Sequence, residues 1–201
     1  VVAICLALPT VGHAAGPTTG APLLAHRAMY ALTLNKKATS AIPGSDTIAA
    51  RGTMAYEIVD ACDGWTVRQQ MRISTTNTDG QISLKASDYA TWESKDGLRF
   101  KFHSVDAADD SIVARTDGDA SLSATGGAGK ARYRTPETSV IPLPAGTMFP
   151  TAHTLAIMNA ARGGKKFVAL PLFDGTDEAG VQDSSVAIDR KSTRLNSSHI
   201  T

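Results

Sequence analysis

The dipeptide Asp-Gly recurs along this chain and separates segments in which apolar and polar residues alternate. It occurs five times, at Asp63-Gly64, Asp79-Gly80, Asp96-Gly97, Asp117-Gly118 and Asp174-Gly175. Asp-Gly tolerates the positive φ angles of a type I′ turn, whose twist matches the strands of an antiparallel hairpin. The spacing therefore predicts antiparallel strands that are joined in sequence order.

The segments between the first four dipeptides alternate as half-buried strands do. Their apolar sides consist of Trp65, Val67, Met71 and Ile73; of Ile82, Leu84, Ala86, Ala90 and Trp92; and of Leu98, Phe100 and Phe102. Two earlier strands would carry Ala28, Tyr30, Leu32 and Leu34 on one side, and Met54, Tyr56 and Ile58 on one side. Weaker strands are expected at 111–115 and 131–134, around the glycine-rich turn 126–129. We expect the apolar sides to face a common core.

Turns this far apart predict long strands. Long, twisted strands in sequence order tend to curl towards closure, because closure removes exposed edges. The expected fold is therefore mainly β, a long-stranded antiparallel meander or barrel. One short α-helix is predicted at 151–162, with Thr151 as its N-cap and Gly163-Gly164 as its stop. Residues 167–173 then resume as a strand, which Pro171 favours at a sheet edge.

The first residues, 1–14, have the pattern of a signal peptide without its charged start. The apolar run 1–11 has the length of a signal-peptide core and is too short to span a bilayer, and small residues allow cleavage after Ala14. A buried N-terminal helix is the alternative, which Pro9 disfavours. Residues 15–25 are expected to be a flexible mature N-terminus. The sequence therefore predicts an exported, periplasmic protein with no integral membrane span.

Residues 189–201 read DRKSTRLNSSHIT, which is also the translation of a common sequencing adapter. We expect this segment to be an artefact of DNA sequencing, so that the native chain is visible only to residue 188. Without the four charged residues of this segment, 20 basic and 19 acidic residues become 17 and 18, and the formal charge moves from +1 to −1. The overall charge gives no reason to expect nucleic acid as a partner.

The chain contains two cysteines, Cys5 and Cys62. Cys5 would leave with the signal peptide, which makes Cys62 the one thiol of the visible mature chain. A single thiol in an oxidising compartment favours pairing with another cysteine. A free, buried cysteine is the alternative, and the residues alone leave both open.

Asp88 is the one acid–base candidate, because it falls on the apolar side of residues 82–92, where burial would raise the pKa of its carboxyl group. A local bulge that turns Asp88 outward is the commoner explanation. His26, His103 and His153 are not at metal-ligand spacing. His103 is expected to face solvent, and His153 lies in the first turn of the predicted helix.

Residues 124–131 (ATGGAGKA) superficially resemble a phosphate-binding loop, but they lack its first glycine and its final Ser or Thr. We interpret them as a hairpin loop and expect no nucleotide. Nucleophile motifs are absent as well, so the sequence predicts no catalytic, cofactor or metal site, and no enzyme.

Several motifs in a fixed order resemble one known family. They are His26-Arg27-Ala28-Met29-Tyr30-Ala31-Leu32, Gly52-Thr53-Met54-Ala55-Tyr56-Glu57, Cys62-Asp63-Gly64-Trp65, Trp92-Glu93-Ser94, Gly146-Thr147-Met148-Phe149-Pro150-Thr151-Ala152-His153-Thr154 and Phe173-Asp174-Gly175. Together, from Leu24 to Ile188, they resemble the cell-envelope integrity protein B (EipB) family of Gram-negative alphaproteobacteria.

The resemblance implies a periplasmic protein with a spiral, β-barrel-like antiparallel fold, of which residues 26–188 would be an incomplete domain. It implies a role in cell-envelope integrity without catalysis, with an envelope protein, a lipid or a lipoprotein as partner. The alternative is a periplasmic hydrolase that acts on an envelope component and uses Asp88 or His153 together with residues from the part of the chain beyond residue 188. The family also carries a disulfide between a cysteine that Cys62 matches and one near the C-terminus, which would lie beyond residue 188.

Overall fold

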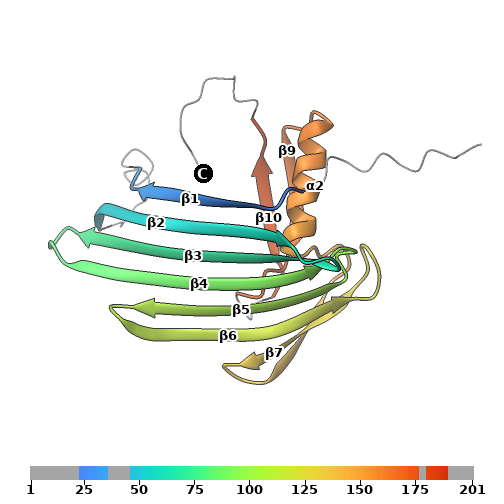
Figure 1. The fold of residues 1–201 in the computed structure, drawn as a ribbon, viewed down its shortest axis with the longest axis horizontal. Coiled ribbons are helices and arrows are strands. Elements are labelled where there is room, and N and C mark those ends of the chain that lie inside the picture. The colour runs from blue at the N-terminus through green and yellow to red at the C-terminus, as the bar shows by residue number, and fades with distance from the viewer. Residues whose placement is uncertain (1–22, 36–45, 177–179, 190–201) are drawn as a thin grey trace, which may run out of the picture.

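The computed structural model describes residues 23–35, 46–176 and 180–189. Within these ranges, eight antiparallel strands form one sheet whose order in space follows the order in sequence (Figure 1). The strands are β1 (His26–Thr33), β2 (Thr47–Asp60), β3 (Gly64–Asn77), β4 (Ile82–Ser94), β5 (Arg99–Ala108), β6 (Ser111–Leu122), β7 (Gly129–Thr135) and β8 (Ser139–Leu143). The predicted long-stranded meander is confirmed, and the sheet is not closed. The predicted signal peptide 1–14 lies outside the described residues, as do the start of 15–25 and all but Asp189 of the expected adapter segment.

One helix and a second, two-stranded sheet follow the meander. They are α2 (Pro150–Arg162), β9 (Phe167–Leu172) and β10 (Gln182–Ala187). β9 pairs with β10 in a sheet of only two strands, which agrees with the predicted edge position of Pro171. At its last residue, Leu172, β9 also forms a single parallel bridge with Met148. No helix among the described residues is both long enough and apolar enough to cross a bilayer.

The buried core lies between these later elements and one end of the main sheet. Phe149, which precedes α2, stacks on Phe100 of β5 with ring centroids 5.1 Å apart. Phe173, which follows β9, meets Phe102 of β5 edge to face at 5.8 Å. The whole cluster consists of Phe100, Phe102, Ala120, Leu122, Ala131, Tyr133, Leu143, Phe149 and Phe173. We call the side of the main sheet that bears this core the packed face, and the other side the open face.

The register of the strands assigns every residue of the sheet to one face, because directly paired residues point to the same side. The apolar sides predicted for β1, β2, β3 and β5 lie on the packed face, as expected. The prediction for β4 was wrong: Phe100 and Phe102 pair with Glu93 and Thr91, so Glu93 and Thr91 face the core. The predicted apolar side of β4 faces outward, and Ile82 is 67% exposed.

The Asp-Gly dipeptides do not all form the predicted turns. Gly80 and Gly97 lie in the turns after β3 and β4 and have positive φ angles of 78° and 70°. Asp79 and Asp96, which precede them, do not have positive φ angles, so these turns are not of type I′. Asp109 and Asp110, between β5 and β6, have the two successive positive φ angles of a type I′ turn.

Asp117-Gly118 lies inside β6, where a turn was predicted. A Cβ atom on Gly118 would lie 2.4 Å from the ring of Phe102, and one on Gly175 would also lie 2.4 Å from that ring. These two glycines are therefore needed for close packing on Phe102. The local sequence shows only the Asp-Gly dipeptide and not the distant Phe102, so it predicts a turn at this position.

The helix begins earlier than predicted. Its N-cap is Phe149, with Pro150 in the first turn, and Thr151 lies within the helix and is buried. The predicted stop is confirmed. Gly164 has a φ of 76°, and the N–H groups of Gly164 and Lys165 donate to the carbonyls of Ala161 and Ala160.

Two strands were not predicted at all. β8 is five residues long and contains a proline, and β10 reads QDSSVA, so neither shows a strong alternation. The predicted weak strands on either side of residues 123–128 are confirmed as the β6–β7 hairpin, and the sequence that resembled a phosphate-binding loop occupies that hairpin.

Candidate functional site

Cys62 lies at the tip of the β2–β3 turn. It is exposed, and its φ of 65° places it in the left-handed region that non-glycine residues rarely adopt. The N–H of Asp63 donates to the carbonyl of Ala61 across it at 2.8 Å, and its own N–H donates to Asp60 Oδ1 at 3.0 Å. The alternative of a buried cysteine is therefore wrong, while the predicted disulfide stays a prediction.

Asp88 and His153, the residues of the hydrolase alternative, lie on different sides of the main sheet. Asp88 is half-buried on the open face and accepts a hydrogen bond from Gln70 Nε2 at 2.5 Å. His153 belongs to α2 and is buried, and burial lowers the pKa of its imidazole. Its Nε2 has no hydrogen-bond partner among the residues that the structure describes. The structure does not bring these two side chains together.

The other two histidines have surface positions. His26 is exposed on β1, where its ring lies 5.6 Å from that of Tyr56. His103 is exposed on the open face, as predicted, with its Nδ1 3.6 Å from the carboxylate of Asp117.

Sequence reasoning gave Glu93 no role beyond its place in a family motif. Its carboxylate is buried on the packed face and accepts hydrogen bonds from the N–H groups of Thr151 and Ala152, at 2.6 and 2.8 Å. Burial raises the pKa of Glu93, and the two N–H donors partly oppose that rise. The negative charge lies at the positive end of the helix dipole, so Glu93 caps α2 in place of Phe149, which has no capping side chain.

The packed face extends beyond the core, across β1, β2 and β3. No residue of these strands belongs to the described core cluster. Their packed-face side chains are nevertheless largely apolar and half-buried. The larger half-buried apolar side chains among them are Leu32, Met54, Tyr56, Val67, Met71 and Ile73, which we call the apolar stripe. Met54 and Met71 pair directly across β2 and β3 at its centre. Methionine adapts its shape to irregular apolar partners.

The open face carries most of the charge of the sheet. Apart from Lys85, the basic residues of β1–β7 lie there: Arg27, Arg51, Arg68, Arg72, Arg99, Lys101, Arg115, Lys130, Arg132 and Arg134. The acidic residues of the same strands on this face are Glu57, Asp88, Asp117 and Asp119. The overall charge is balanced, so the excess of basic residues on the open face becomes visible only when the strand register is known.

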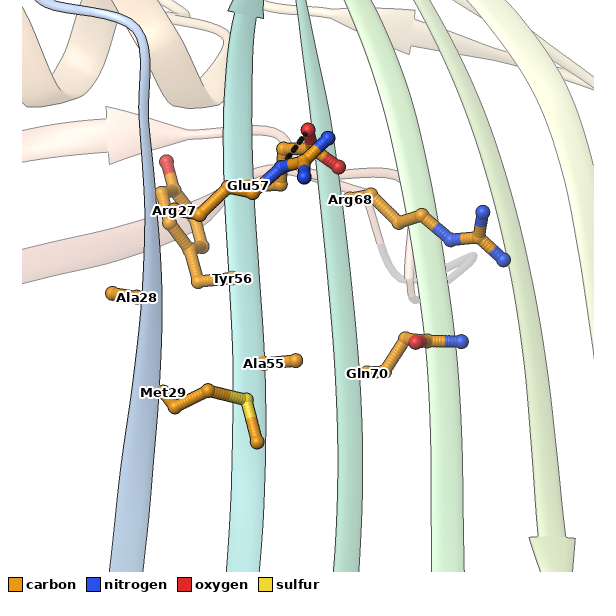
Figure 2. Close-up of a pocket in the computed structure, with 8 residues that line it drawn as sticks. All are labelled: Arg27, Ala28, Met29, Ala55, Tyr56, Glu57, Arg68 and Gln70. Atoms are coloured by element: carbon orange, nitrogen blue, oxygen red, sulfur yellow. Dashed lines mark hydrogen bonds and ion pairs between the residues drawn. The ribbon is translucent and has the colours of Figure 1, made fainter.

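Three shallow grooves lie on or along this face. Figure 2 shows one of about 460 Å³, where the Arg27–Glu57 ion pair, Arg68 and Gln70 lie on the side of the strands away from β9 and β10. A second groove, of about 620 Å³, is lined by Arg51, Arg72 and Leu84 among others. A third, of about 810 Å³, includes Trp92, whose ring has Arg99 and Lys101 at 5.7 and 5.6 Å from its centroid.

Comparison with known proteins agrees with this architecture. The sequence profile of the family described as EipB-like matches residues 17–201. A curated relative, the cell envelope integrity protein EipB of Brucella abortus (strain 2308), is 29% identical over 167 residues. The match covers 83% of this chain and 57% of that relative, so the chain spans little more than half of the relative's length.

A solved structure is also similar. The crystal structure of a beta-barrel-like protein of a domain of unknown function from Brucella abortus superposes with a TM-score of 0.73 and 29% sequence identity. The similarity covers 82% of this chain and 68% of that one. The profile match, the curated relative and the shared fold together establish the family suggested by the motifs. This chain belongs to the EipB-like family.

Proposed function

We propose that this chain acts in the periplasm as a non-enzymatic factor of cell-envelope integrity, and that it binds an envelope protein or a lipid-like ligand through the apolar stripe. The name of the curated relative supports the envelope role. The apolar run 1–11 and the small residues up to Ala14, which are typical of a signal peptide, support export.

The observation that carries the binding proposal is the apolar stripe itself. Its side chains are half-buried on a face that bears the core only at its other end, towards β5–β8. A curved apolar wall beside a packed core is a common setting for small-molecule sites. Burial and the neighbouring Tyr30 raise the pKa of Tyr56, which is therefore neutral at physiological pH and adds no charge to this wall.

A charge placed in the stripe tests the proposal. We expect Met71→Glu to weaken binding of the fluorescent fatty acid cis-parinaric acid at least tenfold, because an ionised carboxylate in an apolar contact is strongly unfavourable. Thr78→Glu is the matched control, since Thr78 is exposed in the turn that follows β3, away from the stripe and from the grooves. Equal binding by both variants and the unmodified chain would show that the stripe is not the site.

The same variants can be tested in cells. In a bacterium that lacks its own copy of the gene, the unmodified chain and Thr78→Glu should restore growth on a membrane-active detergent, while Met71→Glu should not. An Asp88→Ala/His153→Ala variant, checked for folding by circular dichroism, should also restore growth. Loss of rescue by this folded variant would favour the hydrolase alternative.

A further inference from the structure

The positive charge of the open face is not neutralised within the molecule. Its acidic side chains each already have a partner: Glu57 binds Arg27, Asp88 accepts from Gln70, and Asp117 and Asp119 bind Arg134. In contrast, Arg51, Arg68, Arg72 and Arg115 make no hydrogen bond or ion pair with any other residue that the structure describes. These four exposed guanidinium groups remain available to an anionic partner.

Large apolar side chains are exposed on the same face. Met29 is 74% exposed, Val140 58%, Ile112 53% and Leu84 48%. These apolar side chains lie next to arginines. Leu84 pairs with Ser74, which is the open-face residue next to Arg72 on β3. Met29 is the open-face residue next to Arg27 on β1. Apolar side chains that gather on one exposed face and are rimmed by polar groups mark a surface for interaction with a protein or a membrane.

The grooves combine both kinds of side chain. Arg68 and Met29 line the groove in Figure 2, and Arg51, Arg72 and Leu84 line the second. In each, a guanidinium group can bind a phosphate through paired N–H donors, while the aliphatic side chain beside it can enter the boundary between headgroups and acyl chains.

We propose that the open face of the main sheet binds the surface of a bilayer that contains anionic phospholipids. The arginines would contact lipid phosphates, and the exposed aliphatic side chains would lie in the headgroup layer, with Trp92 at the same interface, a place that tryptophan favours. This surface is on the opposite side of the sheet from the apolar stripe, so the inference goes beyond the proposed function and is independent of it.

Nucleic acid fits this face less well. Single-stranded nucleic acid is bound on aromatic side chains that stack on the bases. Trp92 is the one aromatic residue on the open face of β1–β8 among the described residues, and the exposed aliphatic side chains would have no apolar partner on a duplex.

Vesicle sedimentation of the 201-residue chain tests the inference. The chain should bind vesicles of equal parts phosphatidylcholine and phosphatidylglycerol, and not vesicles of phosphatidylcholine alone. In Arg51→Gln/Arg68→Gln/Arg72→Gln the apparent affinity should fall by about 100-fold, because each basic side chain near an anionic bilayer contributes about 1 kcal/mol. Lys165→Gln, at an exposed position just after α2, should change it little.

Further arms separate the alternatives. Leu84→Ser should weaken the binding that remains at high salt, where electrostatic attraction is screened. Soluble glycerol phosphate should not displace the chain from vesicles, whereas displacement would indicate a site for free phosphate. Equal binding to both vesicle types, or unchanged binding by the triple variant, overturns the proposal. So does binding to polyglutamate or to single-stranded DNA without binding to the anionic vesicles.

Discussion

Glu93 is an acidic residue whose side chain is buried on the packed face of the main sheet. It reaches the N-terminus of α2 from a strand 58 residues earlier in the chain, and so ties the helix to the main sheet. Cys62 and His153 are two further residues whose surroundings the sequence left open, the first being exposed and the second buried. Each of the three makes a separate prediction.

Removal of the Glu93 carboxylate should destabilise the protein. In Glu93→Ala, the buried N–H of Thr151 and the partly buried N–H of Ala152 lose their acceptor, which costs about 1–3 kcal/mol for a buried donor left unsatisfied. Glu93→Gln keeps one acceptor oxygen and should lose less. Urea denaturation measures both changes. A Glu93→Ala variant as stable as the unmodified protein would mean that water can replace the cap.

His153 should make stability depend on pH. Burial lowers the pKa of its imidazole below the ordinary value of 6.5, so below pH 6.5 the unfolded chain takes up a proton that the folded chain does not. The free energy of unfolding should therefore fall between pH about 7.5 and about 5.5. In His153→Leu this part of the fall should vanish. Urea denaturation of the unmodified protein and of His153→Leu at both pH values measures this difference. An equal change in the free energy of unfolding for the two proteins would contradict the prediction.

The thiol of Cys62 should be reactive in the native protein, because its side chain is exposed. In a Cys5→Ser background, a maleimide reagent should label it as fast without denaturant as with it. Slow labelling that a reductant accelerates would show that the thiol is already paired. If a longer chain supplies the second cysteine, the disulfide should stabilise that chain by roughly 2–4 kcal/mol relative to Cys62→Ser.

Among the elements, β5 and β6 determine how closely the core can pack. Gly118 of β6 and Gly175 after β9 leave room for Phe102 on either side. Gly118→Ala should destabilise the protein by about 1–3 kcal/mol, the usual range for overpacking. A Cβ atom there would also lie 2.5 Å from the backbone oxygen of Arg132, which cannot move aside easily. Ser121→Ala, at an exposed position of the same strand, serves as the thermal-melting control and should change the midpoint little.

The elements also show what the sequence can predict. Alternation found the strands β1–β5 and the first residues of β6. It assigned the correct face to four of the five strands whose sides it specified, because those strands have one apolar and one polar side. It failed for β4, where Glu93 and Thr91 face inward for their partners on α2 and β5, while Ile82 and Leu84 face outward. The capping of α2 by Glu93 and the positive charge of the open face both depend on how distant segments pair, so no local sequence pattern predicts them.

In the whole molecule, the core and the binding candidates occupy different parts of one sheet. The aromatic cluster joins β5–β8 to α2 and β9, whereas β1–β3 carry the apolar stripe without joining that cluster. Stability should therefore be uneven along the sheet. Hydrogen exchange followed by mass spectrometry should find the slowest backbone amides in β5–β7 and the fastest strand amides in β1. Equal protection of β1 and β5 would show that the sheet unfolds as a single unit.

The open sheet has a consequence for how other chains can join it. Among the described residues, β1 pairs only with β2 and β8 only with β7, so each presents one row of backbone N–H and C=O groups without strand partners. Any strand that extends this sheet, from this chain or another, must be added beside one of these two. β1 is the longer of these two edge strands, with eight residues against five in β8. The side chains of Arg27 and Met29, which belong to β1, would then lie beside those of the added strand. Backbone geometry thus limits where the sheet can grow before any side chain selects the partner.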